Sequence, residues 1–146
     1  MATHQKVLLE YAGSTPDQLE VESVWAVPVD GAYRIDNIPF YAQGIALGDL
    51  VAVSQDEDGM LRFRSLVLPS GHSTVRLWFP KDSDSNKVME VRNQLRGMGC
   101  PSEVSDIPRL VAVDIPPSVS YKVVRQFLDE HEKLGAFEFE EACLGQ

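Results

Sequence analysis

The sequence has few cysteines and no long apolar run, and these two shortages exclude several classes of protein. Two of its 146 residues are cysteine, Cys100 and Cys143, which is too few for the disulfide framework of a small secreted domain. Two cysteines and three scattered histidines also lack the spacing of a zinc site, and no cofactor is indicated. No apolar run approaches the ~20 residues that span a bilayer, and no secretion signal is evident. We therefore expect a cytoplasmic protein with reduced thiols and no membrane partner.

Basic residues are also scarce, because 13 lysines and arginines stand against 22 aspartates and glutamates, for a net charge of -9. Proteins that bind nucleic acids neutralise phosphates with Lys and Arg, so a nucleic-acid partner is not expected. Acidic residues are most concentrated near the end of the chain, opposed there by Lys133. We call this group the acidic strip, and its members are Asp129, Glu130, Glu132, Glu138, Glu140 and Glu141. It is either a solvated face or a docking surface for a basic partner.

Residues 1–71 predict short strands and no helix. Segment 19–29 alternates between apolar and polar residues, which indicates a half-buried strand with its apolar face inward. The apolar face is Leu19, Val21, Trp25 and Val27, and Glu20 and Glu22 lie opposite. Asp30-Gly31 is a tight-turn pair that predicts a hairpin with segment 33–38. Five or six short strands are expected, and a small β-barrel or a curled antiparallel sheet would bury them.

Residues 72–146 predict a different, mixed pattern. Strands are expected at 73–79, 101–104, 110–115 and 136–144, with helices at 87–98 and from Ser118 or Ser120 to Gly135. The resulting βαββαβ order is that of a ferredoxin-like sandwich with sheet order fourth-first-third-second. We therefore predict an α+β protein of two domains, 1–71 and 72–146. Cys100 and Cys143 would lie at opposite sheet edges, too far apart to form a disulfide.

Two short segments gather most of the unusual polar residues. They are Y-R-I-D-N-I-P-F-Y at 33–41 and S-G-H-S-T-V-R at 70–76. If the segments meet, they form a polar cluster of Arg34, Asp36, Asn37, Tyr41, His72 and Arg76. In an enzyme, His72 would act as a general base oriented by Asp36, with Arg76 or Arg34 holding an anionic substrate. The alternative is that His72 and Arg76 satisfy backbone groups in a bend. No sequence motif of a known catalytic class is present.

The same segments resemble an uncharacterised bacterial domain family of unknown function. The resemblance is carried by V-W-A-V-P-V-D-G-A-Y-R-I-D-N-I-P-F-Y-A-Q-G-I-A-L-G-D-L-V-A-V and by S-G-H-S-T-V-R, and it extends over roughly 7–144. It implies a small cytoplasmic bacterial protein and brings no catalytic residues. It also implies that some members are immunity proteins, which bind and neutralise a toxin.

These observations favour a non-enzymatic binding protein. The specific hypothesis is an immunity protein that uses the acidic strip to occlude the active site of a cognate toxin with a basic cleft. A small-molecule-sensing module is the alternative by analogy of fold alone. A small hydrolase or transferase that uses Asp36, His72 and Arg76 is the third hypothesis. A homo-oligomer is left open.

Overall fold

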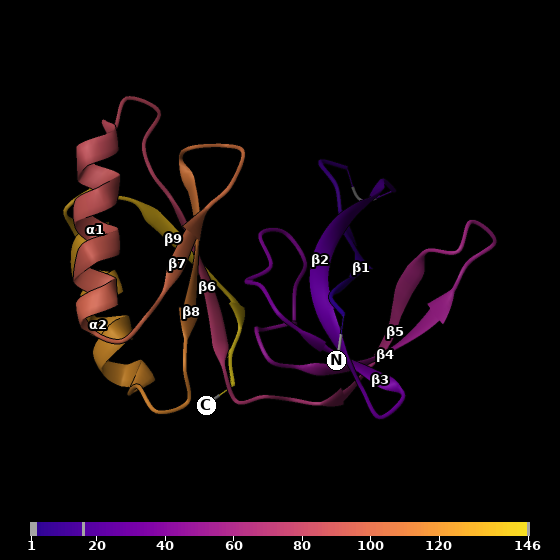
Figure 1. Ribbon diagram of the computed structural model, residues 1–146. Coiled ribbons are helices and arrows are strands. Elements are labelled where there is room, and N and C mark those ends of the chain that lie inside the picture. Colours follow the sequence, from indigo (N-terminus) through magenta and orange to yellow (C-terminus); the bar gives the residue numbers. More distant parts are fainter. Residues whose placement is uncertain (1–2, 16, 146) are drawn as a thin grey trace.

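The computed structural model describes residues 3–15 and 17–145, which form two β-sheets and two helices (Figure 1). The predicted α+β class is confirmed, with five strands in the first half of the chain. In chain order the elements are β1 (Gln5–Ala12), β2 (Leu19–Val29), β3 (Ala32–Ile35), β4 (Leu50–Gln55), β5 (Leu61–Leu68), β6 (Ser73–Trp78), α1 (Ser85–Gly97), β7 (Ser102–Val104), β8 (Leu110–Ile115), α2 (Tyr121–Lys133) and β9 (Glu138–Cys143).

Strands β1 to β5 form a closed barrel in sequence order. Neighbouring strands pair antiparallel, and a short parallel pairing of Val7 with Leu61 closes the ring between β1 and β5. Asp30 and Gly31 both have positive φ, 47° and 84°. These angles suit the two-residue turn that joins β2 to β3 with the twist of a hairpin.

Strand β2 turns the opposite face inward from the one predicted. Leu19, Val21 and Trp25 are 67%, 46% and 47% exposed, whereas Glu22 and Val24 are buried. The prediction was wrong because it assumed that the carboxylate of Glu22 must face solvent. Register with β1 places Glu22 opposite the buried Leu9. A shift of one residue exchanges the two faces of a strand, so one misjudged residue inverts the whole assignment.

The other four strands form an antiparallel sheet in the order β7-β8-β6-β9, which is the predicted order. Both helices cover one face of this sheet (Figure 1). Val91 and Leu95 of α1 and Val124 and Leu128 of α2 are buried in its core. Cys100 precedes the edge strand β7 and Cys143 ends the opposite edge strand β9, and both thiols are free. The predicted placement of the two cysteines toward opposite edges of the sheet is therefore confirmed.

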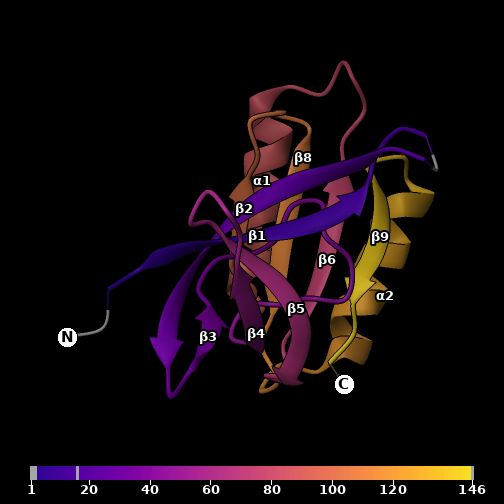
Figure 2. The ribbon, with the colours of Figure 1, turned by 90° about the vertical axis from the view of Figure 1, so that its right-hand side faces the viewer.

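The remaining face of the sheet is turned toward the barrel (Figures 1 and 2). Along β6, Val75 and Leu77 belong to the core under the helices. Thr74 and Arg76 alternate with them and face the barrel, where they are buried. Residues 36–49 connect β3 to β4 and lie between barrel and sheet (Figure 1). We call them the bridging segment.

Candidate functional site

The bridging segment is held from the barrel side by Glu22. Its carboxylate accepts hydrogen bonds from the backbone N–H groups of Phe40, Tyr41 and Ala42, at 2.5, 3.0 and 3.0 Å. Successive N–H groups that converge in this way form a concave anion site, here filled by a side chain of the same protein. No sequence signal distinguished Glu22 from Glu20, its exposed neighbour on β2.

Arg76 holds the same segment from the sheet side. Its side chain is 1% exposed. One Nη donates to the carbonyl of Pro39 at 3.3 Å and the other to that of Tyr41 at 3.1 Å. Nε donates to Glu140 at 2.7 Å across the β6–β9 pair. The two unusual segments therefore meet through the backbone carbonyls of one segment and an arginine of the other that is enclosed by protein.

Asp49 anchors the end of the bridging segment. One carboxylate oxygen accepts from the N–H of Ala46 at 3.0 Å and the other from the N–H of Ser70 at 2.8 Å. The Ser70 hydroxyl donates to the carbonyl of Leu47 at 2.8 Å. Gly48, with φ +86°, lies where a Cβ would come 3.1 Å from the Cβ of Ser70. Glycine is therefore required at this close approach.

His72 is paired with Asp114 of β8 and not with Asp36. His72 Nδ1 lies 2.8 Å from Asp114 Oδ1, whereas the Asp36 carboxylate contacts His4 near solvent. The predicted orientation of His72 by Asp36 was wrong, because Asp114 occupies the barrel-facing side of the sheet beside the bend at 70–72. Burial raises the pKa of Asp114, and the hydrogen bond and charge of His72 act against that rise.

The other members of the predicted cluster do not converge on a shared site. Arg34 is exposed on β3, and the Asn37 side-chain oxygen accepts from the N–H of Trp25 at 2.6 Å. The Tyr41 hydroxyl donates to Asp106 at 3.4 Å, while its ring stacks on Tyr11 at 5.1 Å. The arrangement fixes the junction between barrel and sheet.

The acidic strip runs along α2 and the edge strand β9, and arginines neutralise part of it. Arg125 contacts Asp129 at 3.1 Å and Glu141 at 3.0 Å, and Glu140 is the partner of Arg76. Glu132 accepts from the N–H of Phe139 at 3.0 Å.

Glu130 and Glu138 are exposed and contact no arginine among the described ion pairs. Carboxylates on an edge strand also discourage pairing with other chains.

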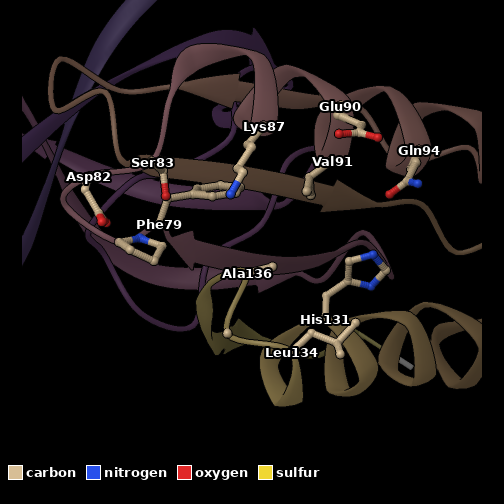
Figure 3. A pocket seen from close by; sticks show the side chains of 12 residues that line it. Phe79, Asp82, Ser83, Lys87, Glu90, Val91, Gln94, His131, Leu134 and Ala136 are labelled. Atoms are coloured by element: carbon tan, nitrogen blue, oxygen red, sulfur yellow. The ribbon is translucent and has the colours of Figure 1, made fainter.

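A cavity of about 440 Å³ lies between the two helices (Figure 3). Glu90 and Gln94 of α1 face His131 of α2 across it, and Phe79 and Val91 supply apolar walls. His131 Nδ1 donates to the carbonyl of Phe127 at 2.9 Å. The polar lining carries both signs of charge.

A second cavity of about 480 Å³ lies beside α1 and shares Phe79, Pro80 and Ser83 with the first. Within residues 3–15 and 17–145, no group of three His, Cys, Asp or Glu side chains is placed to hold a metal ion. Neither described helix is long and apolar enough to cross a membrane.

These features define a class: a two-part α+β protein in which buried charged side chains join a five-stranded barrel to a helix-covered sheet. The chain belongs to the family described as domain of unknown function DUF4265, whose model matches residues 22–139. The predicted resemblance to an uncharacterised family is thereby confirmed. The fold is also similar to a hypothetical protein from Neisseria gonorrhoeae, with TM-score 0.82 and 23% sequence identity over 99% of this chain and 97% of that one. The comparison with curated proteins gave no match.

Proposed function

We propose that this protein acts by binding a partner protein and not by catalysis, and that it is an immunity protein for a toxin with a basic cleft. The observation that carries the proposal is the acidic strip. Its carboxylates outnumber the arginines that contact them, and Glu130 and Glu138 are exposed. A surface of one sign of charge steers association with a partner of the opposite sign and fixes its register.

The polar cluster supports the same proposal by a separate argument. His72 and Arg76, the side chains that a hydrolase or transferase would use, are engaged with Asp114, Glu140 and backbone carbonyls. Arg76 is enclosed, so a substrate would have to displace its internal partners.

We further infer that the second half of the chain is a ferredoxin-like sandwich. Two observations support this inference: the elements follow the βαββαβ order, and the strands of the sheet lie in the order β7-β8-β6-β9 with antiparallel neighbours. In this arrangement both helices lie on the face away from the barrel, which leaves α2 and β9 accessible to a partner.

The test is affinity capture from a lysate of the source organism, followed by an assay of the captured protein's activity. We expect one basic protein in stoichiometric amount, and we expect its activity to be inhibited by the purified chain. The variant Glu130→Lys with Glu138→Lys should weaken binding at least about tenfold. Its matched control is Glu57→Lys with Asp58→Lys, an equal charge change at exposed residues of the β4–β5 turn.

Equal weakening by both variants would mean that only net charge matters and would contradict a role for the strip. A captured protein whose activity is unaffected by the chain would contradict the immunity function itself.

A further inference from the structure

The cavity beside α1 is an apolar groove with a basic rim. Its apolar lining includes Val88 and Met89 from α1, Val104 from β7, and Pro108 from the β7–β8 loop. Met89 and Val104 are 47% and 39% exposed. The volume of about 480 Å³ is in the range of small-molecule sites.

The charges around this groove are all of one sign, although the chain as a whole is acidic. Lys81, Arg92 and Arg109 line it, and the described lining includes no Asp or Glu. Four acidic residues adjoin lining residues in sequence, and none of them lines the groove. They are Asp82, Asp84, Glu90 and Glu103, and Glu90 lines the cavity between the helices. The carboxylate of Asp84 accepts the N–H of Lys87 at the start of α1, and Asp82 lines the cavity on the other side of Phe79.

Two of the three cations are held in place by the fold. Arg92 donates to the hydroxyl of Ser102 from Nε at 2.9 Å and to its carbonyl from one Nη at 3.0 Å. Arg109 donates from Nε to the carbonyl of Phe79 at 2.9 Å. No described hydrogen bond uses the other Nη of Arg92 or either Nη of Arg109. The Arg109 guanidinium also lies 6.0 Å from the centroid of the Trp78 ring and lines a third cavity with Glu132 and Glu138. Positive groups that are already fixed lose little side-chain entropy when an anion binds.

We propose that this groove binds a small molecule that has an apolar body and a single carboxylate. The body would pack on Met89 and Val104, and the carboxylate would meet Arg92 and Arg109, with Lys81 closing the rim. This site is separate from the acidic strip and does not rest on the proposed toxin-binding function. It gives the small-molecule alternative a definite place in the fold.

The test is isothermal titration calorimetry of the intact chain with 2-naphthoate, decanoate and the uncharged analogue 2-naphthol. For ligands of this size we expect a dissociation constant on the order of 0.1 mM. We expect 2-naphthol to bind at least about fivefold more weakly, because it lacks the carboxylate. Comparison of the two acids shows whether the groove prefers an aromatic body or an alkyl chain.

Two variants test the location of the site. Met89→Glu places a carboxylate in the groove and should weaken 2-naphthoate binding about tenfold or more, whereas Val123→Glu, at a 56% exposed position of α2, should not. Lys81→Gln should weaken binding about threefold, and Lys87→Gln, which alters the cavity between the helices, should leave it unchanged. Circular dichroism checks that each variant is folded.

Four results would overturn the proposal, and the first three concern the ligands and Met89→Glu. The first is that neither acid binds at concentrations up to about ten times the expected dissociation constant. The second is that 2-naphthol binds as tightly as 2-naphthoate, and the third is that folded Met89→Glu binds 2-naphthoate as tightly as the native protein does. A larger loss in Lys87→Gln than in Lys81→Gln would place the ligand between the helices and would also overturn it.

Discussion

Replacement of Glu22 by alanine should strongly destabilise the protein. The change removes the acceptor of three backbone N–H groups, those of Phe40, Tyr41 and Ala42. A buried donor left without a partner costs about 1–3 kcal/mol. Three of them give a loss of about 3–6 kcal/mol if water satisfies them in part, against a typical total of about 5–15 kcal/mol.

Glu22→Gln should cost less, because the geometry assigns two donors to one oxygen. Oε1 accepts from Tyr41 and Ala42, and Oε2 accepts from Phe40. An amide oxygen in place of Oε1 keeps the hydrogen bonds from Tyr41 and Ala42. The amide NH₂ then faces the N–H of Phe40, and because both groups are donors this hydrogen bond is lost. We expect a loss of about 2 kcal/mol and faster hydrogen exchange at Phe40 than at Tyr41 or Ala42.

The assay is urea unfolding followed by both circular dichroism and tryptophan fluorescence, since coincident transitions justify a two-state analysis. The matched control is Glu20→Ala on the same strand, where the exposed carboxylate accepts from the Tyr11 hydroxyl. This control should lie within about 0.5 kcal/mol of the native protein. If Glu22→Ala unfolds as the control does, the bridging segment does not depend on Glu22 and the reasoning fails.

Three further predictions concern the sheet side. Arg76→Ala should cost about 3–5 kcal/mol in thermal unfolding, because it leaves the carbonyls of Pro39 and Tyr41 without their donor and opens a cavity at a buried position. Glu140→Gln should cost about 1 kcal/mol or less, because this position is half-exposed. Burial raises the pKa of Cys100 to about 11 and also raises that of Cys143. Ellman's reagent at pH 8 should therefore label Cys100 at least about 100-fold more slowly in the native protein than in urea, and equal rates would contradict this. The raised pKa of Asp114 favours the folded state at low pH, and this contribution is lost as pH rises from about 3.8 through the folded pKa. Asp114→Asn should thus gain in thermal midpoint relative to the native protein as pH rises from 4 to 7, and a relative loss over that range would refute the sign.

The elements of the fold were predictable because their signals are local. Alternation located β2, the Asp30-Gly31 pair located its hairpin, and three- and four-residue spacing located α1. The order of strands in the second sheet followed from right-handed crossovers between elements already recognised. Each of these inferences needs a few neighbouring residues and no knowledge of distant contacts.

The candidate site was predictable only in part, because its contacts join residues far apart in the chain. The unusual residues at 33–41 and 70–76 do meet, since Arg76 reaches the carbonyls of Pro39 and Tyr41. The partners that complete the network come from elsewhere. Glu22 lies on an alternating strand and Asp114 at the end of an apolar one, and neither spacing marks a residue that will be buried with its charge. A carboxylate can be buried only where other groups of the fold donate hydrogen bonds to it, and a single sequence does not show which distant residues supply those donors.

The second sheet places the two proposed binding surfaces toward its opposite edges. The groove adjoins the edge strand β7 through Val104, and the acidic strip includes the opposite edge strand β9. No residue of the acidic strip lines the groove, but Arg109 of the groove also lines a third cavity together with Glu132 and Glu138 of the strip. A toxin seated along α2 and β9 would leave the groove open, and a small carboxylate in the groove would leave Glu130 and Glu138 exposed. Met89→Glu should therefore leave partner binding unchanged, and Glu130→Lys, at a residue that lines neither the groove nor the third cavity, should leave 2-naphthoate binding unchanged. Coupling in either direction would contradict the independence of the two surfaces.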